Sequence, residues 1–384
     1  MHRLLSERGQ RIAGLVALVG VGLLAFHNLV GWITFAINRA FEGDFAAYYA
    51  FTRVGLHAGF AHLYDVAAQR REWDALGPLL WYPAVYPPPL AFLVAPLAFL
   101  PFPIAYAIWN VLLGVAVLVT WRLLAPGSRW QRGMQLGIAL AVPLVAFSLL
   151  LGQVVMLLGA VLALTWWCLR RGSPVLAGII LGLIVVKPQL AFLVPLALLA
   201  GLHFRIVIAW ASATAAIGLV TVAAVGTSGI GAYVNRLQDA TSGLDAYQVP
   251  VGLTLPGLVG HGVTALAAQI AVVAGIATAA FVGRARGPQW SIALGVIGSL
   301  LITPFYHPDD LAILIPATWL WMRTGPSALE RALMAAGLCG ALLLGTPLPL
   351  ALCLLAALVS VGDLPSVIRP LRWRARRTPL QEAA

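Results

Sequence analysis

Apolar runs recur along the whole chain and are separated by short polar segments. Each run holds about 15 to 25 residues, close to the length that a helix needs to cross the hydrocarbon core of a bilayer. The first run covers residues 12–36, and most of the others fall into pairs. The paired runs are 133–151 and 154–170, 174–187 and 189–203, 206–226 and 263–283, 289–303 and 309–322, and 331–346 and 348–362. This pattern predicts an all-α, polytopic membrane helix bundle in which residues 1–384 form one domain.

Arginines gather in short clusters between the paired runs, and they indicate the direction in which each run crosses. The clusters are Arg122/Arg129/Arg132, Arg170/Arg171, Arg205, Arg284/Arg286, Arg323/Arg331 and Arg369 to Arg377. Such clusters favour the cytoplasmic side, and the basic N-terminus belongs there too. If residues 86–124 cross the membrane once, the chain has about 12 spans and both termini lie in the cytoplasm. We therefore predict a short outer-side or partly inserted helix over 86–100 and a span over 103–124.

Two polar segments on the outer side are longer than the other connections, at residues 40–86 and 227–262. Both carry aromatic and charged residues at helical spacing, which predicts amphipathic helices on the outer interface. Four aromatic residues of the first segment are expected at headgroup depth: Trp73, Trp81, Tyr82 and Tyr86. With the short helix that follows, the first outer region extends over 40–100. The basic segment 365–384 is expected to be a cytoplasmic tail.

The composition supports a membrane protein and argues against other classes. Hydrophobic residues make up 61% and charged residues 10% of the chain, whereas a soluble domain has about 25% charged residues. The net charge of +11 does not indicate nucleic-acid binding, because the arginines lie in separate short loops rather than on one face. Cys168, Cys339 and Cys353 all fall within apolar runs, and their odd number and spacing indicate neither a disulfide framework nor a metal site.

Four polar residues from distant parts of the chain are predicted to lie on the outer side: Asp44, Gln153, Lys187 and His307. Lys187 is the only lysine and ends a strongly apolar run, where an ionisable group is costly and usually functional. Its ammonium suits a phosphate group as a point charge. The alternative is a lysine that extends to the outer headgroups.

The other three residues also allow structural roles. Asp44 could be a base at the membrane surface or the N-cap of a helix that begins near Phe45. His307 could be a base, a phosphate ligand, an orienting partner of a carboxylate, or a structural residue. The pair Asp309–Asp310 could begin the next helix, or form a metal site with His307. Gln153 could be a polar tie between helices.

Taken together, these segments resemble glycosyltransferase family 87, within the C-type superfamily of transferases that use polyprenyl-phosphate sugars. The resemblance is carried by Gly43-Asp44-Phe45-Ala46-Ala47-Tyr48-Tyr49, Gly59, Leu63-Tyr64, Tyr86-Pro87-Pro88, Pro96-Leu97, Leu100-Pro101, Trp109, Gly152-Gln153, Ala177-Gly178, Lys187-Pro188, and Thr303-Pro304 before His307. It covers most of the chain. His307 is followed by a proline and two acids, where family members often carry other polar residues, and this leaves the acceptor open.

The resemblance implies a C-type glycosyltransferase fold and a reaction. A hexose, with mannose as the expected sugar, would pass with inversion from a polyprenyl-phosphate donor to a lipid or glycan acceptor. The reaction would take place at the outer face of a bacterial plasma membrane. No cofactor is implied beyond the donor substrate, and metal dependence stays open.

The resemblance also implies roles for named residues. Asp44 would be the general base, and His307 a second catalytic residue near it. Lys187, Arg53 and Gln153 would bind the donor phosphate. Tyr48, Tyr49 and Tyr86 would line the substrate site.

Two other classes of membrane protein are alternatives. A transporter or flippase for a lipid-linked sugar or lipid would carry its polar groups near the bilayer midplane, often at broken helices. An O-antigen-type ligase or polymerase favours an arginine-rich outer site, whereas most arginines here are predicted to lie inside.

Overall fold

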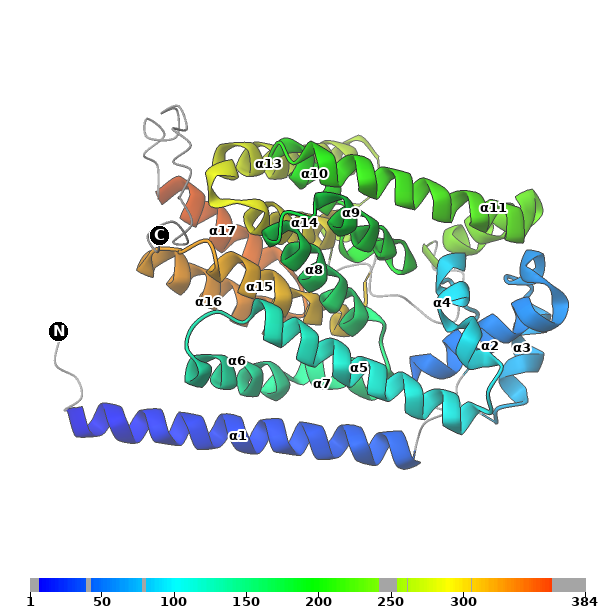
Figure 1. Cartoon of the computed structure of the whole chain (residues 1–384), viewed down its shortest axis with the longest axis horizontal. Helices are drawn as coiled ribbons and strands as arrows, with labels where there is room; N and C mark the ends of the chain where they lie inside the picture. Colours follow the sequence, from blue (N-terminus) through cyan, green and yellow to red (C-terminus); the bar gives the residue numbers. More distant parts are fainter. Residues whose placement is uncertain are drawn as a thin grey trace, which may run out of the picture.

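The computed structural model describes residues 7–38, 43–77, 81–241, 254–260, 262–304 and 306–360. Within these ranges the chain forms helices, turns and short connections, with no strand. Figure 1 shows the helices packed side by side in an elongated bundle. The predicted tail over 365–384 lies outside the described residues.

The helices follow the apolar runs closely. The α-helices are α1 (Glu7–Asn38), α2 (Asp44–Ala58), α3 (Val66–Asp74), α4 (Pro88–Ala98), α5 (Phe102–Leu124), α6 (Arg129–Ala141), α7 (Pro143–Leu151), α8 (Val155–Arg170), α9 (Pro174–Leu181), α10 (Val194–Ala200), α11 (Phe204–Thr241), α12 (Leu255–Val259), α13 (Val263–Val282), α14 (Pro288–Ile302), α15 (Leu314–Met322), α16 (Ala328–Leu344) and α17 (Leu348–Ser360). Short 3-10 helices are η2 (Phe60–His62), η3 (Gly182–Val186), η4 (Pro188–Leu190), η6 (Gly283–Arg286) and η7 (Pro308–Ile313).

Four of the described helices are long and apolar enough to cross a bilayer. They contain Gly14–Asn38, Phe102–Leu124, Phe204–Ala240 and Val263–Arg286. The pair α6 and α7, bent by 67°, adds a fifth span if it is counted as one. The predicted all-helical membrane class is therefore confirmed. The count of about 12 spans stays a prediction, because several remaining apolar helices are only 10–17 residues long.

The division of residues 86–124 follows the prediction. A short helix, α4, comes first, and the turn at Pro101 then leads into α5, which is long enough to span. Pro103 suits the first turn of α5 because its missing N–H group would have no helical partner there. Helix α1 lies along α6 and α7 at one side of the bundle (Figure 1). Its outward apolar side chains, such as Phe26 at 65% exposure, are not covered by the described protein and suit lipid.

Helix α2 differs from its prediction. It was expected to lie on the outer interface, but ten of its 15 residues are buried. It packs against α3 and α4, and Phe45 stacks on Trp109 of α5 with ring centroids 5.0 Å apart. The interfacial prediction was wrong here because the aromatic residues of α2 contact protein on every side rather than along one stripe.

Helix α11 also differs, because the predicted second outer segment 227–262 begins as its continuation. The helix breaks at Gly226, whose φ of 71° is unfavourable for any residue with a side chain, and then runs on to Thr241. A short helix, α12, follows within the same segment. Residues 242–253 and 261 lie outside the described part of the chain.

Helices α8 and α14 form the centre of the bundle and connect its two ends. Thirteen of the 15 residues of α14 are buried, and α8 packs against α5, α9 and α14. A helix of this length spans about 24 Å. Residues that flank the start of α8 and the end of α14 therefore meet at one end of the molecule, and the residues at the opposite helix ends meet at the other.

Candidate active site

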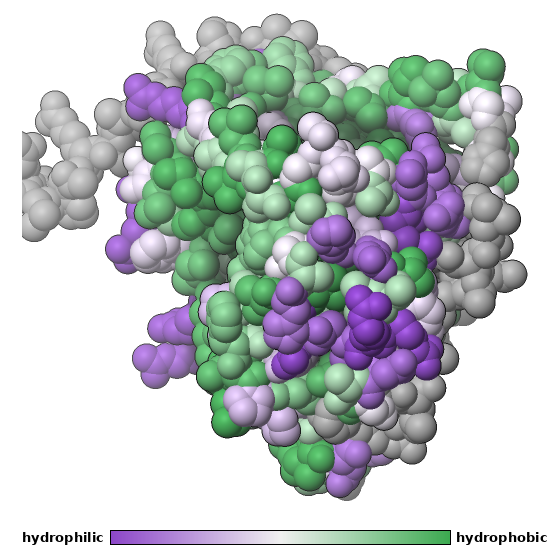
Figure 2. All heavy atoms as spheres, turned by 90° about the vertical axis from the view of Figure 1, so that its right-hand side faces the viewer, coloured by the Kyte–Doolittle hydropathy of each residue, from purple (hydrophilic) through white to green (hydrophobic). Residues whose placement is uncertain are grey.

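A cavity of about 520 Å³ opens at the end where α2 and α8 begin and α14 ends. Its lining includes Asp44, Tyr82, Gln153, Lys187, Arg236 and His307, which come from six different segments. Figure 2 faces the end of the molecule that carries α2 and α3, and shows polar side chains gathered over part of it with apolar side chains around them. The cavity lining combines these charged groups with apolar side chains such as Phe147, Leu151 and Phe192.

Asp44 is held by two neutral hydrogen-bond donors. The Tyr82 hydroxyl donates to Oδ1 at 2.5 Å, and the Gln153 amide donates to Oδ2. The alternative role of Asp44 as an N-cap does not match the structure, because Gly43 occupies the cap position of α2 and the Asp44 oxygens accept from Tyr82 and Gln153. A carboxylate can accept about four hydrogen bonds. Asp44 therefore keeps acceptor capacity toward the cavity that it lines.

Gln153 has a fixed orientation. Its Oε1 accepts from the Tyr48 hydroxyl at 2.9 Å and from Lys187 Nζ at 3.0 Å. A lysine ammonium can only donate, so the amide oxygen must face Lys187 and the amide nitrogen must face Asp44. The turn before Gln153 uses Gly152 in the left-handed region, with φ 74°, and the Trp109 indole donates to the Gly152 carbonyl at 2.8 Å. This turn places Gln153 between the base candidate and the ammonium.

Lys187 forms a buried ion pair with Asp310. Its Nζ donates to Asp310 Oδ1, and the side chains are 7% and 1% exposed. Asp310 Oδ2 accepts from the His307 backbone N–H at 3.1 Å, so this carboxylate also holds the loop before η7. The charge of Lys187 is therefore already balanced within the protein.

Two groups at the cavity have shifted proton affinities. Burial raises the pKa of the Asp44 carboxyl above its ordinary value of 3.8, while the Tyr82 hydroxyl and the charges of Lys187 and His307 act to lower it. Burial, and then the nearby Lys187 charge, lower the pKa of His307 below 6.5. A carboxylate with a raised pKa is a stronger base, and His307 takes up a proton less readily than a free imidazole does.

The structure brings most of the predicted site residues together. Asp44, Gln153, Lys187, His307 and Tyr86 line the cavity. Tyr48 reaches them through Gln153.

Two predicted residues do not join this group. The Tyr49 hydroxyl donates to the Leu100 carbonyl at 2.7 Å, away from the cavity. Arg53 pairs with Glu72 at 2.8 Å instead of facing the cavity. The structure therefore does not place these two side chains with the cavity residues, and their substrate-binding roles stay predictions.

The sequence reasoning missed three residues that line the cavity: Tyr82, Arg236 and Asp309. Tyr82 was expected at headgroup depth, and nothing in its neighbours along the chain indicates its contact with Asp44. Arg236 gave a weaker signal than Lys187, because the predicted outer segment 40–86 also carries Arg53, Arg70 and Arg71. Asp309 was interpreted as the start of a helix or as part of a metal site, and not as a residue that binds substrate. It does lie in η7, but it is 2% exposed and its Oδ2 accepts no hydrogen bond from the described residues.

The alternative of a metal site at His307, Asp309 and Asp310 does not match the geometry. Among the described residues, no group of three or more His, Cys, Asp or Glu side chains is placed to hold a metal ion. Asp310 uses its two oxygens for Lys187 and the His307 backbone.

The fold and the cavity define a class: an all-helical membrane protein with a candidate base at one end of its bundle. The family model for glycosyltransferase family 87 matches residues 84–304, which is more than half of the chain. The chain therefore belongs to glycosyltransferase family 87 and is a membrane glycosyltransferase. The match includes Gln153, Lys187 and Arg236, whereas Asp44 and His307 lie outside it. Comparison with curated proteins and with solved structures gave no match.

Proposed function

We propose that this protein transfers a hexose, with mannose as the first sugar to test, from a polyprenyl-phosphate donor to a lipid or glycan acceptor. The observation that carries the proposal is the position of the Asp44 carboxylate, which lines the cavity. Tyr82 and Gln153 hold this carboxylate, and it can still accept further hydrogen bonds. Family membership supplies the reaction class. The acidic, basic and apolar parts of the cavity fit a lipid that carries a phosphate and a sugar.

Asp44 acts as the general base in this proposal. Its carboxylate takes the proton of the acceptor hydroxyl, and that oxygen forms a bond to the anomeric carbon. The bond from the anomeric carbon to the phosphate oxygen breaks, and the polyprenyl phosphate leaves with the electron pair. A single direct displacement inverts the configuration at the anomeric carbon. The raised pKa of Asp44 supports this role, because the base must hold a proton as the new bond forms.

Arg236 is the best-placed partner for the donor phosphate. Its side chain is buried, lines the cavity and lies on α11 beyond the break at Gly226. Its Nη1 lies 3.9 Å from Oδ2 of Asp239, whose side chain is 53% exposed. A guanidinium binds phosphate with two parallel hydrogen bonds. Lys187, in contrast, is neutralised by Asp310 and acts on Asp44 through Gln153.

Asp309 fits a hydroxyl of the donor sugar. Asp309 lines the cavity, and its buried Oδ2 accepts no hydrogen bond from the described chain. An acceptor that is buried without a donor is costly, and a sugar hydroxyl would supply one. This contact would hold the sugar ring close to Asp44.

The orientation in the membrane is part of the same proposal. We expect a C-type fold of about 12 spans in a bacterial plasma membrane, with both termini in the cytoplasm and the cavity on the outer face. The arginine clusters support this orientation. Arg122, Arg170, Arg286 and Arg323 lie at or just beyond the ends of α5, α8, α13 and α15, at the end of the bundle opposite the cavity (Figure 1).

A transfer assay tests the proposed function. Purified protein is incubated with radiolabelled polyprenyl-phosphate mannose and a membrane lipid extract, and the lipids are separated. Label is expected in a new lipid or glycan product. If label stays in the donor with every sugar and extract tried, the proposed reaction is refuted.

Replacing Arg236 by glutamine should weaken donor use. The change removes a charge-assisted contact worth about 1.5–3 kcal/mol, so KM for the donor should rise about tenfold or more. Steady-state kinetics with a varied donor concentration measures this. The matched control is Arg70→Gln, an exposed arginine on α3 that pairs with Asp74. Equal donor KM values in the Arg236 and Arg70 variants would show that Arg236 does not bind the donor phosphate.

Replacing Tyr82 by phenylalanine should move the pH profile. Transfer needs deprotonated Asp44, so kcat/KM falls as the pH drops through its raised pKa. The Tyr82 hydroxyl lowers that pKa. Without this hydroxyl, the fall of kcat/KM on the acidic side of the profile shifts to higher pH. A pH series of kcat/KM measures the shift, with Tyr106→Phe as a tyrosine control outside the cavity lining. If the fall of kcat/KM at low pH stays at the same pH, or moves to lower pH, the result argues against Asp44 as the titrating base.

A further inference from the structure

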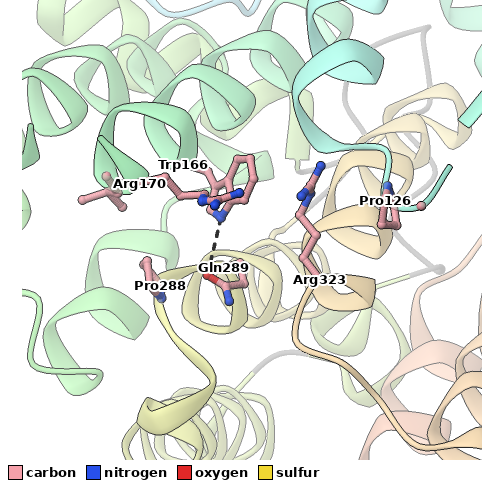
Figure 3. Close-up of a pocket in the computed structure, with 8 residues that line it drawn as sticks. Pro126, Trp166, Arg170, Pro288, Gln289 and Arg323 are labelled. Carbon is pink, nitrogen blue, oxygen red and sulfur yellow. Dashed lines mark hydrogen bonds between the residues drawn. The ribbon is translucent and has the colours of Figure 1, made fainter. Parts of the chain in front are cut away.

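A second cavity lies at the opposite end of the bundle from Asp44. It has a volume of about 540 Å³ and is lined by the end of α8, the start of α14, the loop after α5 and the residue after α15. Figure 3 shows its principal side chains, among them Trp166, Arg170, Gln289 and Arg323. Because α8 and α14 each run from one cavity to the other, the two sites are about one helix length apart.

Two arginines meet at one indole ring in this cavity. The guanidinium carbon of Arg323 lies 4.4 Å from the centroid of the Trp166 ring, and that of Arg170 lies 5.2 Å from it. Trp166 is buried, and its indole nitrogen lies 3.4 Å from Gln289 Oε1 (Figure 3). Contact with an aromatic face holds a guanidinium in place without neutralising its charge. The ring therefore brings two cations together.

These charges have no acidic partner among the described residues. The Arg170 guanidinium lies over the Trp166 ring rather than beside a carboxylate, and no aspartate or glutamate lines the cavity. Arg323 donates through Nε and Nη2 to carbonyl oxygens, which leaves its Nη1 group unused. The carbonyls belong to Leu123, Leu124 and Ala125. Arg132 and Arg170 both repel Arg323 electrostatically. An anion that enters the cavity would relieve this repulsion.

The start of α14 adds to the positive potential. Its first residues, Pro288 and Gln289, line the cavity, and no side chain caps this helix end. The N-terminus of a 15-residue helix carries a partial positive charge and presents backbone N–H groups to an anion. Two guanidiniums and a helix N-terminus on one concave surface are typical of a phosphate site.

We propose that this cavity binds a phosphate group at the end of the protein away from the active site. The phosphate belongs either to a phospholipid headgroup or to a soluble phosphate, because both present the same oxygens to the guanidiniums. This site does not depend on the proposed sugar transfer. Positive-inside bias alone would account for arginines at this end, but it does not account for a concave site shared by two arginines, an indole and a helix N-terminus.

The neighbouring Arg171 provides a matched control. It also follows α8 and lies over an aromatic ring, 4.2 Å from the centroid of Trp167, but it does not line the cavity. Both Arg170 and Arg171 are exposed, so a glutamine at either position leaves the packed core unchanged. The two variants lose the same charge at the same end of the molecule. Only Arg170→Gln removes it from the cavity.

Native mass spectrometry of the delipidated full chain tests the site. Binding of phosphatidylglycerol is compared with binding of diacylglycerol with the same acyl chains, and with binding of inorganic phosphate. We expect selective binding of phosphatidylglycerol or phosphate by the wild type, about tenfold weaker in Arg170→Gln, and unchanged in Arg171→Gln. Binding of the lipid alone identifies a headgroup, and binding of inorganic phosphate identifies a soluble ligand. Equal effects of the two variants, or no preference over diacylglycerol and no phosphate binding, would overturn the proposal.

Discussion

Replacing Asp44 by asparagine is expected to lower the rate of sugar transfer by a factor of about 10² to 10⁴, the range that a positioned general base contributes. Asparagine has nearly the same shape but takes up no proton, so the acceptor hydroxyl loses its base. The Tyr82 hydroxyl can still donate to the side-chain oxygen at this position. Single-turnover rates at saturating donor give the effect on the chemical step.

The control for this variant is Asp74→Asn, which removes an exposed carboxylate paired with Arg70 on α3. It should transfer sugar at the wild-type rate. Donor binding and the unfolding temperature of Asp44→Asn are measured in parallel, so that a folding defect is not counted as lost catalysis. Wild-type turnover by a folded Asp44→Asn protein would show that Asp44 is not the base.

Replacing Lys187 by methionine is expected to lower the free energy of unfolding by about 3–5 kcal/mol, because it leaves the Asp310 carboxylate buried without its partner. Asp310 is 0% exposed, so water cannot replace the lost ammonium. Gln153 also loses the donor that fixes its orientation, so turnover should fall together with stability. Equilibrium unfolding in mixed micelles measures the change in stability.

A second substitution separates the ion pair from the rest of the site. Lys187→Met combined with Asp310→Leu removes both charges, and should recover much of the lost stability without restoring turnover. The comparison pair is Arg70 and Asp74, whose side chains are 52% and 54% exposed. Arg70→Met should cost no more than about 0.5 kcal/mol. Equal destabilisation by Lys187→Met and Arg70→Met would mean that the buried pair does not hold the site.

The sequence was sufficient for the helices but not for the contacts between them. The long apolar runs predicted α1, α5 and α13, because crossing a bilayer requires length and hydrophobicity, and both can be read along the chain. The charge pattern placed Asp44 and His307 on one side of the membrane, and both line one cavity.

Other features depend on contacts that no local pattern encodes. The partner of Lys187 is 123 residues away, so the lysine was interpreted as a phosphate ligand rather than as one half of an ion pair. The aromatic residues of α2 were interpreted as interfacial, since burial by protein and burial by headgroups favour the same side chains. Tyr82 comes from a connecting segment, where nothing in the sequence shows which group a hydroxyl will meet.

The two cavities suggest different uses of the same central helices. At one end, α8 and α14 lie beside Asp44 of α2, whose carboxylate is held by neutral donors and suits proton transfer. At the opposite end lie arginines and an uncapped helix N-terminus, which suit the binding of an anion that does not react. Loss of the second site should therefore leave the chemical step intact, whereas loss of Asp44 should leave phosphate binding intact.

The most direct test of the proposed reaction compares two donors with one purified protein. Mannose is offered either on polyprenyl phosphate or on a nucleoside diphosphate, and the anomeric configuration of the product is determined by nuclear magnetic resonance. We predict transfer from the polyprenyl-phosphate donor alone, with inverted configuration in the product. Transfer from the nucleotide sugar alone, or retained configuration, would contradict direct displacement by an acceptor that Asp44 deprotonates.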